Sequence, residues 1–132
     1  MEPRYSRALW RGCCHLAVER SAHLGDDENA DADLDAAARV IASSVVRNAG
    51  QICYAGTRLV VNRMVADEMI ERVSKLVGDV IAGPTWSLRT TLNPILSLKQ
   101  REKISSILGL GIAAGAELVI GGSAIEAYEG GL

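Results

Sequence analysis

The chain has 132 residues, of which 48% are apolar and 23% are charged, and its formal net charge is −2. A chain of this length fits one domain with a buried core, which must be built from Val, Ile, Leu and Ala because Phe is absent. No cluster of Lys or Arg forms the positive stripe that binds nucleic acid, and no apolar run approaches the roughly 20 residues of a membrane helix. The segment Met1–Val18 lacks the apolar stretch of a signal peptide. We therefore expect a cytoplasmic protein without a nucleic-acid or membrane partner.

The cysteines are Cys13, Cys14 and Cys53, an odd number without regular spacing. Disulfide frameworks use even numbers of cysteines, so we expect reduced thiols. Cys13, Cys14, His15 and His23 lie close together in sequence, but adjacent cysteines lack the Cys-x-x-Cys spacing of zinc sites and no second pair follows. We predict no metal site and attribute the cluster to chance.

The first half of the chain changes character near residue 31. Residues 1–30 show neither a helical nor a strand period, and we interpret them as a poorly specified segment. Asp31 or Asp33 can then cap a helix that ends near Gly50. Its apolar positions recur at intervals of three and four: Leu34, Ala38, Ile41 and Val45.

The second half alternates strands and helices. Thr57–Asn62 is short and β-branched, as a buried strand is, and a helix follows from Ala66. Two X-Pro or Gly-Pro pairs mark residues 82–94 as a loop, and Ser97–Gln100 has the form of a capping box that opens a third helix. Gly115 is placed to end that helix, and Glu117–Ile120 is a second predicted strand. The order predicts an α/β fragment with helices layered on a mostly parallel sheet, followed by a Gly-rich tail at 123–132.

The segment from Asn48 to Arg58 reads Asn-Ala-Gly-Gln-Ile-Cys-Tyr-Ala-Gly-Thr-Arg and lies between a helix end and a strand. This segment, with the preceding Asp-Ala-Asp-Leu-Asp, resembles the cysteine signature of the aldehyde dehydrogenase superfamily. The resemblance covers residues 31–122, which we interpret as part of the catalytic domain of that family. It continues through Val77–Asp79, Leu92–Ile95, Gln100–Lys103, Gly115–Val119 and Gly121–Gly122.

The resemblance implies that Cys53 is a nucleophile. A thiolate that attacks an aldehyde gives a thiohemiacetal, which loses hydride to NAD or NADP and leaves a thioester for hydrolysis. We expect the flanking Gly50 and Gly56 to let substrate approach, and Ile52 and Tyr54 to line an apolar tunnel. The alternative is a buried, inert cysteine.

The family's general base is a glutamate in a Glu-Leu-Gly-Gly motif, and an ungapped count back from Cys53 reaches Glu19. A carboxylate there can activate the water that hydrolyses the thioester. However, Arg20, Ser21 and Ala22 replace Leu-Gly-Gly, and residues 1–30 otherwise match the family poorly. A merely solvated glutamate is the alternative.

The resemblance also places Gln100 and Lys103 where the family contacts the adenosine end of the cofactor. They lie three apart and share a helical face, although two exposed polar side chains would show the same spacing. Gly109, Gly111 and Gly115 form a pattern that is only weakly like a dinucleotide loop, since it lies within a helical period and precedes a strand. Helix packing and a C-cap explain these glycines better.

Two functional classes remain open at this point. In the first, the chain is a truncated NAD(P)-dependent aldehyde dehydrogenase that oxidises a small aldehyde, with negligible turnover alone because the cofactor-loop glycines are missing. In the second, it is a non-enzymatic remnant or an interaction module. The partners we expect are further copies of the chain or full-length relatives.

Overall fold

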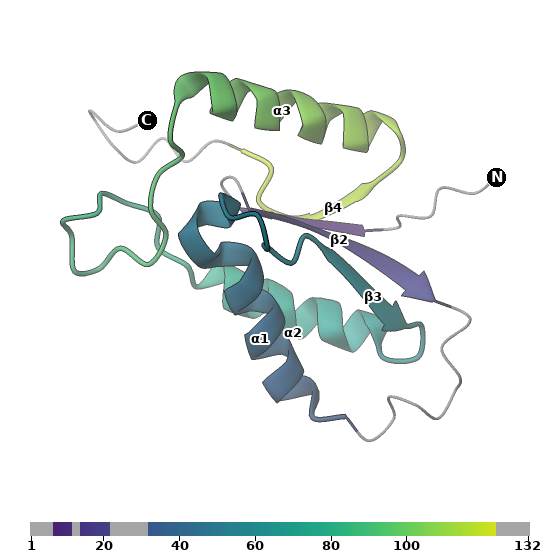
Figure 1. Ribbon diagram of the computed structural model, residues 1–132. Helices are drawn as coiled ribbons and strands as arrows, with labels where there is room; N and C mark the ends of the chain where they lie inside the picture. The colour runs from purple at the N-terminus through teal and green to yellow at the C-terminus, as the bar shows by residue number, and fades with distance from the viewer. Residues whose placement is uncertain (1–6, 12–13, 22–31, 124–132) are drawn as a thin grey trace.

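The computed structural model describes residues 7–11, 14–21 and 32–123, and these form one sheet with helices on both faces (Figure 1). The strands are β1 (Arg7–Arg11), β2 (Cys14–Ser21), β3 (Arg58–Asn62) and β4 (Glu117–Ile120), in the order β3-β2-β1-β4. β2 pairs with β3 and β1 pairs with β4 in parallel, whereas β1 and β2 pair antiparallel. The sheet is therefore mixed, with its antiparallel pair in the centre.

The two central strands come from the segment for which we expected no regular structure. That expectation is wrong for residues 7–11 and 14–21, which form β1 and β2. Each of these two strands is hydrogen-bonded to another strand on both sides. Their structure depends on pairing with distant residues, so a local sequence pattern does not reveal them. Val18 of β2 is fully buried, so this strand also contributes to the core.

The helices divide between the two faces. α1 (Leu34–Val46) and α2 (Ala66–Gly78) lie together on one face, and α3 (Leu98–Ala113) lies on the other (Figure 1). A short 3-10 turn, η1 (Arg47–Gly50), follows α1. Among the described residues, no helix is both long enough and apolar enough to cross a membrane.

Helix ends follow the predicted capping residues. The Asp33 side chain accepts a hydrogen bond from Ala36 N at 2.9 Å, and Ser97 Oγ accepts one from Gln100 N at 3.3 Å. Gly115 lies just beyond the last residue of α3 and has φ 92°, and Ala116 N donates to the Gly111 carbonyl at 3.0 Å. That bond pattern is a Schellman motif, so Gly115 is the predicted C-cap glycine.

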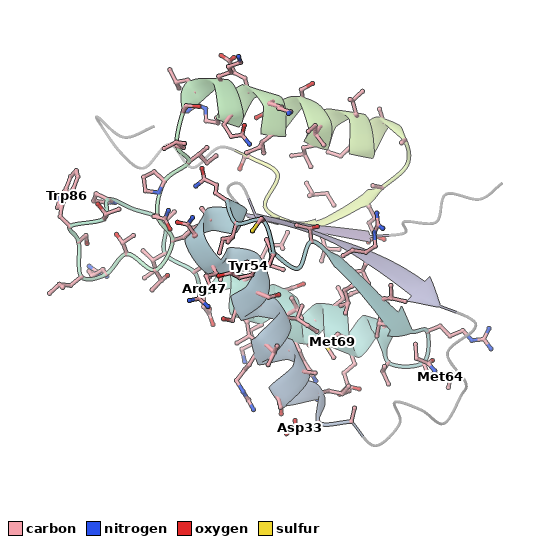
Figure 2. All side chains as sticks on the ribbon, in the orientation of Figure 1. Asp33, Arg47, Tyr54, Met64, Met69 and Trp86 are labelled. Atoms are coloured by element: carbon pink, nitrogen blue, oxygen red, sulfur yellow. The ribbon has the colours of Figure 1, made fainter. Side chains whose placement is uncertain are left out.

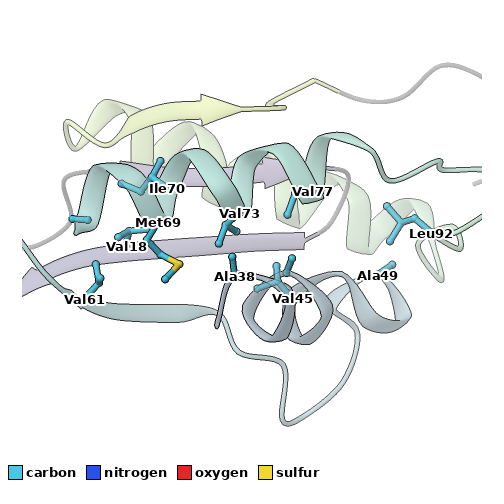
Figure 3. Packing of buried hydrophobic residues seen from close by; sticks show 12 residues of the cluster. Val18, Ala38, Val45, Ala49, Val61, Met69, Ile70, Val73, Val77 and Leu92 are labelled. Atoms are coloured by element: carbon cyan, nitrogen blue, oxygen red, sulfur yellow. The ribbon is translucent and has the colours of Figure 1, made fainter. Parts of the chain in front are cut away.

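The core lies between the sheet and the α1–α2 face (Figure 3). α2 contributes more of it than any other element, because its apolar positions recur on one side of the helix. The buried apolar residues are Val18, Ala38, Ala42, Val45, Ala49, Val61, Ala66, Met69, Ile70, Val73, Val77 and Leu92.

Candidate active site

A left-handed turn connects α1 to the segment that carries Cys53. Asn48, Ala49 and Gly50 have φ values of 49°, 55° and 72°. Left-handed backbone is unfavourable for residues with a Cβ, so two consecutive non-glycine residues there require support from their surroundings. Part of that support is burial, because Ala49 has no exposed surface and belongs to the core.

Cys53 lies in the next turn along the chain. Ala55 N donates to the Ile52 carbonyl at 3.1 Å, which closes a turn with Cys53 and Tyr54 at its centre. Cys53 is a free, exposed cysteine, so the alternative of a buried thiol is wrong. Its reactivity remains a prediction. Tyr54 is 68% exposed and projects from the segment between α1 and β3 (Figure 2), whereas Ile52 is half-buried.

Gly56 allows a close contact within the chain, and its expected role in substrate approach remains a prediction. A Cβ at this position would lie 2.7 Å from Ser44 Oγ on α1, and that hydroxyl already donates to the Ile41 carbonyl at 2.8 Å. The missing side chain therefore allows the cysteine segment to pack against α1. This close contact is with a helix of the same chain.

Amide side chains join the cysteine segment to the loop at residues 93–96, here called the 93–96 loop. Gln51 Oε1 accepts a hydrogen bond from Leu96 N at 2.9 Å, and Gln51 Nε2 donates to the Pro94 carbonyl at 3.3 Å. Asn93 Nδ2 donates to Asn48 Oδ1 at 3.2 Å. Gln51 Nε2 also donates to the Asn48 carbonyl at 3.4 Å, and Asn48 Nδ2 donates to the Gln51 carbonyl at 3.4 Å. Sequence reasoning gave no role to these amides, although the motif contains Asn48 and Gln51.

Glu19 lies in β2, where its backbone is paired with Val60 of β3. β3 directly follows the cysteine segment in the chain. β2, which carries Glu19, is therefore the neighbour in the sheet of the strand that follows Cys53. The Glu19 side chain falls outside the described part of the chain. Its assignment as a general base remains a prediction.

Gln100 and Lys103 are both exposed on α3. Their spacing places them on one side of the helix, where amide and ammonium donors suit the hydroxyl groups of a ribose. The same helix explains the glycine pattern further along: no atom lies within 4 Å of a Cβ built at Gly109 or Gly111. Those two glycines therefore do not serve helix packing, which corrects that part of our interpretation.

Within the described residues, no group of three or more His, Cys, Asp or Glu side chains is arranged to hold a metal ion. The backbone of Cys14 and His15 belongs to β2. Cys13 and His23 lie outside the described residues.

Comparison with known proteins identifies the family. Residues 29–131 match the sequence profile described as "Aldehyde dehydrogenase family". The chain belongs to the aldehyde dehydrogenase family. The match includes the whole motif around Cys53 and reaches into the tail at 123–132.

Individual aldehyde dehydrogenases agree with this assignment. A mitochondrial aldehyde dehydrogenase of Leishmania tarentolae is 37% identical over 95 residues, which cover 72% of this chain and 19% of the relative. The (Z)-2-((N-methylformamido)methylene)-5-hydroxybutyrolactone dehydrogenase of Acinetobacter baylyi is 31% identical over 128 residues, covering 94% of this chain and 26% of the relative. This second alignment extends into residues 1–30, whereas the family profile starts at residue 29, as the poor match of the N-terminal segment predicts. The chain spans a fifth to a quarter of the length of these relatives.

The fold also matches a solved structure, the NAD-dependent aldehyde dehydrogenase of Sinorhizobium meliloti. The TM-score is 0.70 at 42% sequence identity, over 74% of this chain and 19% of the other. About three quarters of the chain therefore shares the fold of part of an aldehyde dehydrogenase.

Proposed function

We propose that this chain carries the nucleophile of an NAD(P)-dependent aldehyde dehydrogenase and that Cys53 is that nucleophile. The observation that supports the proposal is an exposed, free cysteine at the centre of a hydrogen-bonded turn, within a segment that matches the family. An exposed thiol can ionise and attack a small-molecule substrate.

The proposed reaction begins when the Cys53 thiolate attacks the aldehyde carbonyl carbon. A C–S bond forms, the carbonyl oxygen becomes an oxyanion, and the backbone N–H of Cys53 donates a hydrogen bond to it. Gln100 and Lys103 would hold NAD or NADP, which would supply the acceptor for the hydride of this thiohemiacetal carbon. Water then attacks the resulting thioester, the C–S bond breaks, and the carboxylic acid and the thiolate are released.

Two further roles follow in the proposal. Glu19 takes the proton from the attacking water, as a general base. Gln100 and Lys103 hold the adenosine end of the cofactor, and their exposure on α3 leaves them open to such a ligand. Tyr54 and Ile52 flank the thiol and favour aldehydes with an apolar substituent.

The test of the nucleophile uses an activated ester, because ester acylation needs the thiol but no cofactor. The purified chain is incubated with p-nitrophenyl acetate, and acetyl groups on each cysteine are located by peptide mass spectrometry. We expect Cys53 to be acetylated faster than the cysteine of an unstructured peptide of residues 48–58. Equal rates would refute the proposal, and Cys53→Ala identifies any p-nitrophenolate released at other sites.

Oxidation itself is tested with a panel of aldehydes and either NAD or NADP, following the absorbance of the reduced cofactor. We expect negligible turnover by this chain alone and Cys53-dependent turnover when a polypeptide with a cofactor-binding domain is supplied. Turnover that persists in Cys53→Ala would exclude Cys53 as the nucleophile.

A second candidate function is favoured by the surface of α3. Four large apolar side chains on this helix are half to two-thirds exposed. Of these, Ile107 and Leu110 lie three residues apart on one side of the helix, where they are available for a contact with another protein. In this proposal the chain docks on a full-length aldehyde dehydrogenase and performs no chemistry. Size-exclusion chromatography of the mixture distinguishes it, since docking predicts a complex that Leu110→Asp abolishes while Cys53→Ala does not. The exposed residues are Leu98, Ile107, Leu110 and Ile112.

A further inference from the structure

We infer that Gln51 is a positioning residue that fixes the direction of the Cys53 backbone N–H, with Asn93 in a supporting role. This inference rests on the proposed function of Cys53 and adds residues to it. The Gln51 side chain bonds Asn48, Pro94 and Leu96, and it acts through the turn that it anchors.

The first step concerns the turn before Gln51. Asn48 and Ala49 both adopt left-handed backbone, which costs free energy unless other contacts fix it. Burial holds Ala49, whereas Asn48 is exposed. Hydrogen bonds fix Asn48 instead, because Asn93 Nδ2 donates to its side-chain oxygen at 3.2 Å.

The second step concerns the other end of these hydrogen bonds. Gln51 binds the 93–96 loop through both polar atoms of its carboxamide. Its Oε1 accepts from Leu96 N at 2.9 Å, and its Nε2 donates to the Pro94 carbonyl at 3.3 Å. A bidentate amide fixes orientation as well as distance, because both bonds must be kept in one plane. Leu96 directly precedes Ser97, which caps α3. Gln51 therefore holds the cysteine segment and the start of the cofactor-side helix in one register.

The third step connects Gln51 to the chemistry. The turn at 52–55 begins immediately after Gln51, and a backbone hydrogen bond from Ala55 N to the Ile52 carbonyl closes it. The Ile52 carbonyl and the Cys53 N–H belong to one planar peptide unit, so this bond fixes that plane within the turn. Gln51 then fixes the orientation of the turn, and with it the plane, relative to the 93–96 loop. Hydrogen-bond stabilisation of an oxyanion requires a donor aimed at the developing charge, so rotation of this plane weakens it.

Two reagents separate positioning from mere access to the thiol. p-Nitrophenyl acetate transfers its acetyl group to the Cys53 sulfur: a C–S bond forms, an oxyanion develops on the carbonyl oxygen, and p-nitrophenolate leaves. Iodoacetamide alkylates the same thiolate with loss of iodide and develops no oxyanion. Both rates depend on thiolate exposure, so the ratio of acylation to alkylation at Cys53 reports only the oxyanion donor.

The variants are Gln51→Met, which keeps the length and removes both hydrogen bonds, and Gln51→Glu, which keeps the acceptor for Leu96 N. We expect the ratio to fall about three- to tenfold in Gln51→Met, the range for loss of one or two neutral hydrogen bonds that support the donor. Gln51→Glu should stay within about twofold of the wild-type ratio, and Asn93→Ala should lie between the two variants. The matched control is Lys99→Met, an exposed polar-to-Met change near the start of α3, which should leave the ratio unchanged.

Hydrogen exchange decides between the outcomes. Faster exchange at Leu96 N with unchanged exchange in α2 establishes that Gln51→Met releases the loop while the fold persists. An unchanged ratio in that state, or equal falls in both rates, would overturn the inference and leave the nucleophile proposal intact. A wild-type ratio equal to that of the 48–58 peptide would instead refute the role of Cys53, and the positioning role with it. If Gln51→Met does not fold, Asn93→Ala carries the test, and an unchanged ratio there overturns the inference.

Discussion

The helices on the two faces of the sheet differ sharply in burial. α1 and α2 share a face and bury Val45, Met69 and Val73, whereas α3 on the other face buries no residue and leaves Leu110 68% exposed. All three helices are nevertheless formed. α1 and α2 are stabilised mainly by tertiary packing. α3 packs the half-buried Ile104 against the core and otherwise depends on its capping residues and on helix propensity. Substitutions should therefore have very different effects on the two faces.

The largest expected effect is a buried charge on the packed face. Val73→Asp places a carboxylate at a position with no exposed surface, and we expect a loss of about 4 kcal/mol or more in the free energy of unfolding. Leu110→Asp makes a similar change on α3 and should cost within about 0.5 kcal/mol. Urea unfolding followed by circular dichroism measures both. Similar losses for the two variants would show that α3 is packed in solution.

The next effect concerns the turn at the end of α1. Ala49→Val adds two methyl groups to a fully buried residue and places a β-branched side chain at φ 55°, so we expect a loss of about 2 kcal/mol. The control is Ala113→Val, the same substitution at the exposed end of α3. It should cost about 0.6 kcal/mol, which is the difference in helix propensity between Ala and Val. A small loss at Ala49 would mean that the left-handed turn rearranges without harm to the core.

Local signals explain which parts of this fold were predictable. Asp33, Ser97 and Gly115 mark helix ends through contacts with residues a few positions away, and the structure has helices that begin and end at these marks. β1 and β2 are defined by pairing with distant strands, which no local period reveals. The same reason applies at the site. The motif indicates Cys53, but the hydrogen bonds from Gln51 join residues 43 and 45 positions apart.

A pair of glycine substitutions should sharpen the account of α3, with effects of opposite sign. Gly109→Ala meets no atom within 4 Å and adds a better helix former, so we expect a gain of about 1 kcal/mol in helix stability. Gly115→Ala forces a Cβ into backbone at φ 92° and should cost about 1 kcal/mol. Hydrogen exchange at the amides of α3 measures both changes. Equal shifts in α2 would contradict the independence of the two faces.

The smallest effect is expected at an ion-pair network on the surface of the packed face. Arg72 on α2 contacts Asp35 on α1 and Glu68 one turn earlier. Hydrogen bonds to Glu68, and then to Asp35, raise the pKa of the Arg72 guanidinium above its usual value. Because the pKa of the Arg72 guanidinium is raised, the stabilisation that it provides is present at every pH below the ordinary arginine pKa. It is lost only as pH rises through the raised one, so Arg72 should give no pH dependence near neutrality.

The contribution of the Arg72 ion pairs can be tested by varying the salt concentration. We expect Arg72→Met to lower stability slightly at low ionic strength and to approach the wild type as NaCl is raised, because partly exposed ion pairs are screened. The loss should be small for a second reason: Arg72 Nε is buried without a hydrogen-bond partner, and Met removes this unsatisfied atom. Arg39→Met, at an exposed position on α1, is the matched control in thermal denaturation. A large, salt-independent loss in Arg72→Met would mean that the aliphatic stem of Arg72 contributes packing between α1 and α2 that Met does not reproduce.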